Sequence, residues 1–145
     1  MIDELLATAR TLATAGAARP RQADLKRAIS TAYYAVFHAL ARDAADPLVG
    51  AGARARPEWA RVHRALDHGA AKNACQAVKA GPLAPVFVDL QEARHKADYD
   101  PTFRVNRADA IGWCAQADGA VVALRAVPKA ERRAFAVELL FKKRP

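Results

Sequence analysis

The sequence predicts an all-α protein, an up-and-down bundle of five or six helices formed by a single domain over residues 1–145. Three observations support this fold class. Apolar residues recur every three to four positions, which is the period of an amphipathic helix, and no segment shows the alternation typical of a strand. Alanine, which favours helix and close helix approach, supplies much of the 52% hydrophobic content. Pro and Gly signals separate the periodic segments.

Two helices are predicted in the first third of the chain. The first covers about residues 2–18 and ends before Arg19-Pro20. The second, about residues 22–44, has the clearest periodicity, with a continuous apolar stripe formed by Leu25, Ile29, Ala32, Val36 and Leu40. Asp46-Pro47 and the glycines that follow predict a loop after it.

Four more helices complete the predicted bundle. Pro57 is typical of a helix first turn and opens a third helix that runs toward residue 79. A fourth helix covers about residues 85–100, because the residue before Pro101 resists the α conformation. Asn106, with Asp109 three residues later, resembles an N-terminal cap and opens a fifth helix. Pro128 begins a short sixth helix.

Composition limits the partners and the compartment. The formal net charge is +8 and the sequence pI is about 10.0, which favours a polyanionic partner, although free use of arginine in a GC-rich genome gives the same balance. The acidic N-terminus does not resemble a signal peptide, and the longest apolar run, residues 32–41, is too short to cross a bilayer. Cys75 and Cys114 have no metal-like spacing, so we expect a reduced, cytoplasmic protein.

No metal or cofactor is predicted. The four histidines, at positions 38, 63, 68 and 95, lack a recognisable metal-ligand spacing; His63 and His68, for example, are five residues apart. Neither cysteine has a neighbouring histidine that would activate it. A glycine-rich phosphate loop is also missing from the sequence.

Arg94 is the most informative residue, because it falls where helical periodicity calls for an apolar side chain. Phe87 and Leu90 precede it on the same face, and Asp98 follows one turn later. A charge in this position needs a partner or a polar groove. One interpretation is an internal pair with Asp98. The other is a groove in which Arg94 grips a phosphate and His95 and Tyr99 assist cleavage at a ribose 2′-OH.

Two further faces are candidates for contacts. On the second helix, a narrow polar column is formed by Arg27, Thr31, Tyr34, His38 and Arg42. It is interpreted either as a half-exposed face, or as a wall for an anionic ligand or a subunit interface through Tyr34 and His38. On the third helix, a basic ridge is formed by Arg61, His68, Lys72 and Lys79, with Arg64 at its edge. The ridge suits phosphate contacts, and a solvated face is the alternative.

Two motifs resemble the HEPN superfamily. Residues 27–39, RAISTAYYAVFHA, are similar to its tyrosine-pair helix, and residues 90–100, LQEARHKADYD, to its later arginine motif. Together with the helical layout, the resemblance covers about residues 25–124. It implies an HEPN-like helical bundle that dimerises. Members commonly act as metal-independent ribonucleases in toxin–antitoxin or antiviral systems, often beside a nucleotidyltransferase-like antitoxin, and inactive members bind RNA or nucleotides or serve as scaffolds.

The resemblance also implies roles for individual residues. Arg94 matches the family's arginine and His95 the polar position after it. The family's downstream histidine is replaced here by Tyr99, and a phenol is a poor proton acceptor near neutral pH. Three hypotheses therefore remain: a dimeric ribonuclease, a non-catalytic module that binds RNA or nucleotide, and a homodimeric interaction scaffold.

Overall fold

The computed structural model describes residues 1–77 and 83–144, and within them it contains only helices and the connections between them. Seven α-helices and one short 3₁₀ turn follow one another in the order α1 (Ile2–Thr14), α2 (Gln22–Val49), η1 (Ala51–Ala53), α3 (Pro57–Ala65), α4 (His68–Ala77), α5 (Leu83–Tyr99), α6 (Arg107–Arg125) and α7 (Lys129–Leu140). The predicted all-α fold class is confirmed.

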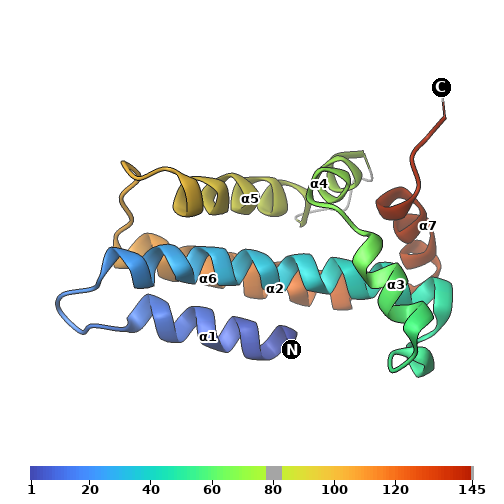
Figure 1. Ribbon diagram of the computed structural model, residues 1–145, viewed down its shortest axis with the longest axis horizontal. Helices are drawn as coiled ribbons and strands as arrows, with labels where there is room; N and C mark the ends of the chain where they lie inside the picture. The colour runs from blue at the N-terminus through green and yellow to red at the C-terminus, as the bar shows by residue number, and fades with distance from the viewer. Residues whose placement is uncertain (78–82, 145) are drawn as a thin grey trace.

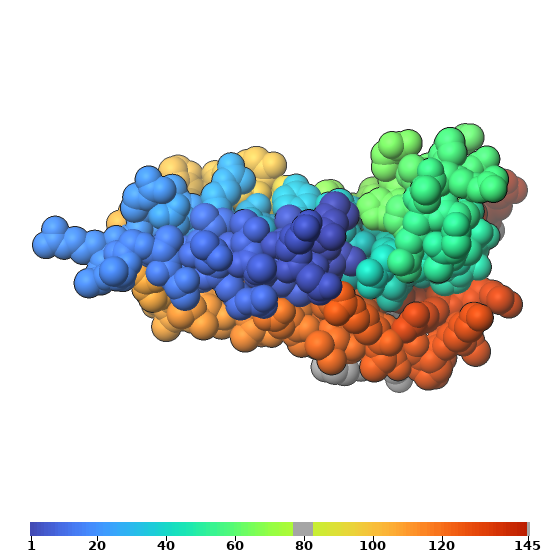
Figure 2. Space-filling view, turned by 90° about the horizontal axis from the view of Figure 1, so that it is seen from below, coloured from blue at the N-terminus to red at the C-terminus, as the bar shows by residue number. Residues whose placement is uncertain are grey.

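Four long helices form an up-and-down bundle, as Figure 1 shows. Along the chain, α1, α2, α5 and α6 run in alternating directions, with α5 on one side of α2 and α6, and α1 on the other. The shorter α3, α4 and α7 lie toward one end. From the α1 side, α1 extends lengthwise over the molecule, with α6 along one edge and α3 beyond its N-terminal end (Figure 2). Each of the other helices packs against α2.

The position of α2 follows from its sequence. Its predicted apolar stripe is completely buried, from Leu25 through Ile29 to Leu40, and Tyr33 is buried with it. At 28 residues, α2 is roughly 42 Å long, so it can contact helices from both ends of the bundle. Buried alanines such as Ala28 let neighbouring helices approach closely.

Two helix boundaries differ from the prediction. The first helix ends at Thr14, because Gly16 and Ala17 both have positive φ and turn the chain out of the helix. The second continues through Pro47 to Val49, although a loop was predicted there. Pro47 lies in the last turn, where a missing N–H costs a single hydrogen bond, and the Gly50 N–H closes the helix on the Asp46 carbonyl at 2.8 Å.

The predicted third helix is in fact two helices, which raises the helix count to seven. Leu66 leaves the helix with an extended backbone (ψ 124°) and buries its side chain. Asp67 then accepts a hydrogen bond from the Ala70 N–H at 2.7 Å, as a capping residue does. The predicted continuous ridge from Arg61 to Lys72 is therefore wrong, and Lys79 lies outside the described residues.

The remaining helices begin close to their predicted positions. Asn106 caps α6 by accepting the Asp109 N–H at 2.7 Å, which confirms the capping prediction. The last helix starts directly after Pro128, and α5 starts at Leu83, slightly before the predicted Pro85. No described helix is both long enough and apolar enough to cross a membrane.

Candidate functional site

Arg94 lies at the boundary between α5 and α2. The buried side of α5 is formed by Phe87, Leu90, Ala93 and Ala97. Arg94 follows Ala93, so its side chain leaves the helix at the edge of this buried side and remains 15% exposed. The helix therefore places a cation next to the apolar core without enclosing it.

Its surroundings fix the Arg94 guanidinium in one position. Nε lies 2.9 Å from Asp98 Oδ2, the pair that their four-residue spacing predicts, and Nη2 donates to the Tyr34 hydroxyl at 2.8 Å. The Nε–H is not directed at the carboxylate, so this contact is an ion pair rather than a hydrogen bond. The guanidinium carbon also lies between 5.3 and 5.7 Å from the ring centres of Tyr33, Tyr34 and Tyr99. These contacts orient the charge before any ligand arrives.

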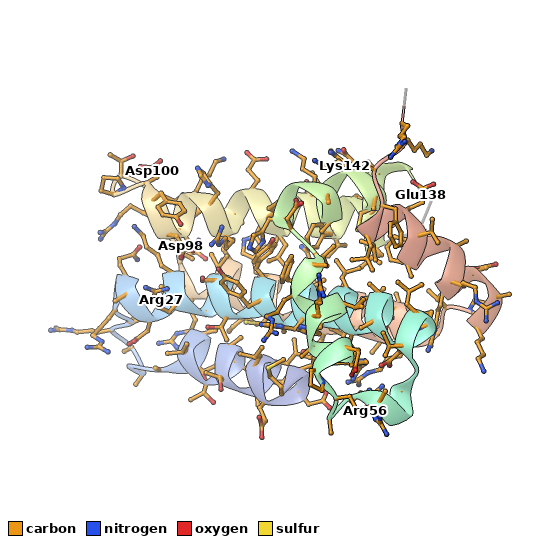
Figure 3. The ribbon with its side chains drawn as sticks, turned by 45° about the vertical axis from the view of Figure 1, so that its right-hand side comes forward. Arg27, Arg56, Asp98, Asp100, Glu138 and Lys142 are labelled. Atoms are coloured by element: carbon orange, nitrogen blue, oxygen red, sulfur yellow. The ribbon has the colours of Figure 1, made fainter. Side chains whose placement is uncertain are left out.

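Asp98 neutralises only part of the positive charge around it. The carboxylate is 14% exposed, accepts a hydrogen bond from Ser30 Oγ at 3.2 Å, and lies 3.9 Å from Arg27 Nη1. Figure 3 shows Arg27 on α2 and Asp98 on α5 facing each other. The Arg27 side chain is 71% exposed. Two guanidinium groups therefore share one carboxylate, and the group keeps a net charge of about +1.

A cavity of about 430 Å³ opens beside Arg94 between α4 and α5. Its lining consists of His68, Lys72, Val88, Gln91, Glu92, Arg94 and His95. Four of the predicted site residues thus come together here: Arg94 and His95 from the proposed catalytic set, and His68 and Lys72 from the basic ridge. They come from two consecutive helices, α4 and α5, which pack against each other.

His68 is the most firmly held of these side chains. Its Nδ1 is hydrogen-bonded to the hydroxyl of the buried Tyr33, and its ring stacks on Phe37 with 4.2 Å between ring centres. Gln91 Nε2 donates to the His68 carbonyl at 3.0 Å, which fixes the backbone. Burial lowers the pKa of His68, and the nearby Arg94 lowers it further. Burial also raises the pKa of Tyr33 to about 12, so that hydroxyl stays neutral.

Tyr34 and His38, the predicted dimer-interface residues, are both half-buried within this protomer. The Tyr34 hydroxyl receives the hydrogen bond from Arg94, and its ring lies 6.3 Å from that of His38. His38 stacks on His63, which in turn stacks on Trp59. Burial lowers the pKa of both histidines. Their role at a subunit interface stays a prediction.

The other predicted site residues lie around the cavity or away from it. Tyr99 is 66% exposed and its ring lies 5.1 Å from that of His95, so the two form the outer edge of the Arg94 cluster. Arg61 and Arg64 are exposed on α3, and within the described residues they line no part of the cavity. The structure thus groups Arg94, His95, Tyr99, His68 and Lys72, with Arg27 behind Asp98, and leaves the two α3 arginines apart.

Sequence reasoning missed three residues that shape this site. Asp67 caps the start of α4 after the α3–α4 break. An aspartate is a preferred capping residue, so the sequence carried a signal for a helix start at this position. Tyr33 was noted as part of the tyrosine-pair motif, and its hydrogen bond to His68 was not foreseen. Gln91 had no sequence signal at all, because its two partners lie on α2 and α4.

Metal and thiol chemistry have little support in the described part of the chain. No group of three or more His, Cys, Asp or Glu side chains is arranged there to hold a metal ion. Burial raises the pKa of the fully buried Cys75 to about 12, so its thiol is inert near neutral pH.

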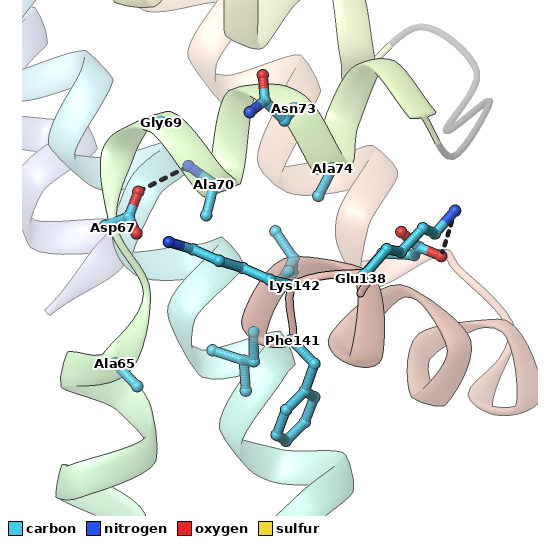
Figure 4. A pocket seen from close by; sticks show the side chains of 12 residues that line it. Ala65, Asp67, Gly69, Ala70, Asn73, Ala74, Glu138, Phe141 and Lys142 are labelled. Carbon is cyan, nitrogen blue, oxygen red and sulfur yellow. Dashed lines mark hydrogen bonds and ion pairs between the residues drawn. The ribbon is translucent and has the colours of Figure 1, made fainter. Parts of the chain in front are cut away.

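A larger cavity, about 610 Å³, lies between the first turn of α4 and the end of α7 (Figure 4). Asp67 and Ala70 face Phe141 and Lys142 across it. Among the residues that the structure describes, none of the predicted site residues lines it, and the acidic groups in its lining are Asp67, which already caps α4, and Glu138, which pairs with Lys143 at 3.5 Å.

The chain was also compared with protein-family models, curated proteins and solved structures, and none of the three comparisons gives a match. The HEPN resemblance therefore stays an expectation from the sequence.

Proposed function

We propose that this protein acts on RNA through the cavity between α4 and α5, as a metal-independent endoribonuclease of the kind found in toxin–antitoxin or antiviral systems. The observation that carries the proposal is the oriented Arg94 guanidinium at the edge of an open cavity that also holds Lys72, His68 and His95. Cations and proton-transfer groups are the side chains that phosphodiester cleavage needs.

The charge distribution supports a phosphate ligand. Arg94 uses Nε and one terminal nitrogen for Asp98 and Tyr34, which leaves Nη1 without a hydrogen-bond partner among the described residues. Lys72, an exposed residue, lines the same cavity, and so does Glu92, whose carboxylate is paired with Lys96 at 3.0 Å. A phosphate between these cations gains charge-assisted hydrogen bonds, and Arg27 adds to the positive potential nearby.

A non-catalytic module that binds RNA or nucleotide is the second candidate. It is favoured by Tyr99, which occupies the position of the family's histidine. This module would bind phosphate at the same cavity as the ribonuclease. The two candidates differ only in whether the bound RNA is cleaved. The homodimeric scaffold rests on the polar column with Tyr34 and His38 as well as on the HEPN resemblance, and the nucleotidyltransferase-like antitoxin partner on the resemblance alone.

The test is cleavage of a single-stranded RNA of mixed sequence in the presence of a chelator. We expect cleavage by the native chain and a loss of at least about 100-fold in Arg94→Ala. Arg61→Ala, on exposed α3 outside the cavity, is the matched control and should cleave at the native rate. RNA that stays intact at high protein concentration argues against the ribonuclease.

Binding and oligomeric state separate the alternatives. In the non-catalytic module, RNA stays intact but binds with an affinity that falls steeply with salt and drops in Arg94→Ala. In the scaffold, the protein is dimeric by analytical ultracentrifugation, Tyr34→Glu makes it monomeric, and RNA affinity is negligible. An RNA affinity that is independent of salt contradicts both RNA-directed functions.

A further inference from the structure

His68 combines a fixed position, a free ring nitrogen and a location in the Arg94 cavity. We infer that His68, on α4, is the group that accepts the proton of the attacking ribose 2′-OH, in place of the histidine that the arginine motif lacks. The inference rests on the proposed ribonuclease function. It restricts the substrate to RNA, because DNA has no 2′-OH to deprotonate.

The first argument is the fixed orientation of the ring. Nδ1 is bonded to the Tyr33 hydroxyl, and the imidazole stacks on the Phe37 ring with 4.2 Å between ring centres. Nε2 has no hydrogen-bond partner among the described residues and is not a buried atom. A base needs this arrangement: one nitrogen holds the ring, and the other is available to substrate in the cavity.

Tyr33 suits both protonation states of such a base. The base role requires the tautomer that carries hydrogen on Nδ1, in which the Tyr33 hydroxyl accepts from Nδ1–H and Nε2 is free; the same hydroxyl still accepts after Nε2 has taken a proton. Because Gln91 Nε2 also lies 3.5 Å from the Tyr33 oxygen, the hydroxyl remains in place throughout. Tyr33 is therefore a positioning residue rather than a catalytic one.

The second argument is electrostatic. The groups around the ring are Tyr33, Tyr34 and His38 from α2, Gln91, Glu92, Arg94 and His95 from α5, and Asp67 and Lys72 beside it in the chain. Burial lowers the pKa of His68 most, Arg94 and His38 lower it further, and Asp67 opposes them. Near pH 7 the imidazole is neutral, which suits a proton acceptor better than the cationic phosphate contact expected from the sequence.

The reaction balances without a co-reactant. His68 Nε2 takes the 2′-OH proton as the 2′ oxygen forms a bond to phosphorus, and the bond from phosphorus to the 5′ oxygen breaks. The 5′ oxygen takes a proton from His95, which lines the cavity from α5 next to Arg94, or from water. The products are a 2′,3′-cyclic phosphate and a 5′-OH end. Arg94 stabilises the charge that develops on the phosphoryl oxygens.

The experiment uses two His68 variants and a matched control. In His68→Asn an amide atom replaces Nδ1 and keeps the contact to Tyr33, but nothing replaces Nε2. His68→Gln serves if the Asn variant does not fold. We expect kcat to fall by at least about 100-fold in either variant, with the RNA Kd within about threefold of native. His63→Asn, a half-buried histidine outside the cavity, should keep native kcat.

Two readouts separate catalysis from a structural role. The native rate should fall as the pH drops through the His68 pKa, and this limb should be absent in His68→Asn. Added imidazole should restore part of the lost rate in His68→Asn but not in Arg94→Ala. Tyr33→Phe, which keeps the ring and removes the hydroxyl, should lower kcat by about tenfold with unchanged KM.

The outcomes distinguish this inference from the proposed function. If the native chain cleaves RNA and a folded His68→Asn or His68→Gln cleaves within about threefold of it, the role of His68 is overturned and the ribonuclease stands. A native chain that leaves RNA intact overturns the ribonuclease and His68's role with it. Cleavage of the matching DNA at a comparable rate overturns the 2′-OH mechanism and the role of His68 in it, while phosphodiester cleavage at this cavity stands.

Discussion

Replacing Arg94 with methionine tests whether the charge cluster is held together by its ion pair. Methionine has similar length and keeps the apolar stem, but it removes the contacts to Asp98 and Tyr34. Removing one partner of a buried pair costs about 3–5 kcal/mol, chiefly because the other charge is left without compensation. Asp98 keeps its Ser30 hydrogen bond and Arg27, so we expect the free energy of unfolding to fall by about 2–3 kcal/mol.

The double variant identifies the source of that cost. Asp98→Asn alone should lose about 1.5 kcal/mol, because Arg94 keeps its hydrogen bond to Tyr34 and its three aromatic neighbours. Independent effects would then sum to about 4 kcal/mol. If most of the cost in Arg94→Met comes from the Asp98 carboxylate left without its partner, the double variant Arg94→Met/Asp98→Asn loses only about 1–2 kcal/mol of unfolding free energy. This loss is smaller than that of Arg94→Met by itself.

Urea unfolding of the native chain and the three variants, followed by circular dichroism, measures these values. Two results refute the reasoning: a loss below about 0.5 kcal/mol in Arg94→Met, or a double variant whose loss equals the sum of the single ones. Repeating the urea unfolding in 1 M salt serves as a control. The Arg94 and Asp98 side chains are only 15% and 14% exposed, so salt screens their pair less than the exposed Lys96–Glu92 pair.

Three further predictions concern the helices that support the site. Asp67→Ala should lower the free energy of unfolding by about 1 kcal/mol, which corresponds to a fall in Tm of about 2–4 °C. Asp67→Asn keeps a capping oxygen, so its stability should stay near native. Equal losses in the two variants would show that the hydrogen bond to the Ala70 N–H contributes little. The pKa values of His38, His63 and His68 are lowered in the folded state, so the unfolded chain binds more protons below about pH 6.5, and stability should fall as the pH is lowered from 7 toward 5. Urea unfolding at several pH values in this range gives the free energy of unfolding as a function of pH. This dependence should be weaker in His63→Gln than in the native chain, and an equal dependence contradicts a lowered pKa of His63. Ile29→Ala should cost about 2–5 kcal/mol by thermal unfolding, because Ile29 is fully buried in the apolar stripe of α2. A loss under 1 kcal/mol would mean that neighbouring side chains fill the cavity left behind.

The main features of the fold could be predicted from local signals in the sequence. The stripe from Leu25 to Leu40 predicted the central helix, and Asn106 with Asp109 predicted the start of α6, because periodicity and capping act within a few residues. The errors at Pro47 and at Leu66 have different causes. Pro47 lies in the last turn of α2, where a missing N–H costs little, so a loop signal stands inside a helix. Leu66 ends α3 and is buried, and local pattern does not carry information on packing against other segments.

The sequence by itself determined which residues of α5 carry charge: Arg94 and Asp98 are one turn apart on the same helix, and their pairing needs no other element. Only the tertiary structure decided what surrounds them. Because α4 folds back beside α5, His68 and Lys72 share a cavity with Arg94, and the Tyr33 hydroxyl on α2 fixes the His68 ring. Contacts between helices distant in the chain depend on how whole faces pack, so this site became visible only once the bundle was assembled.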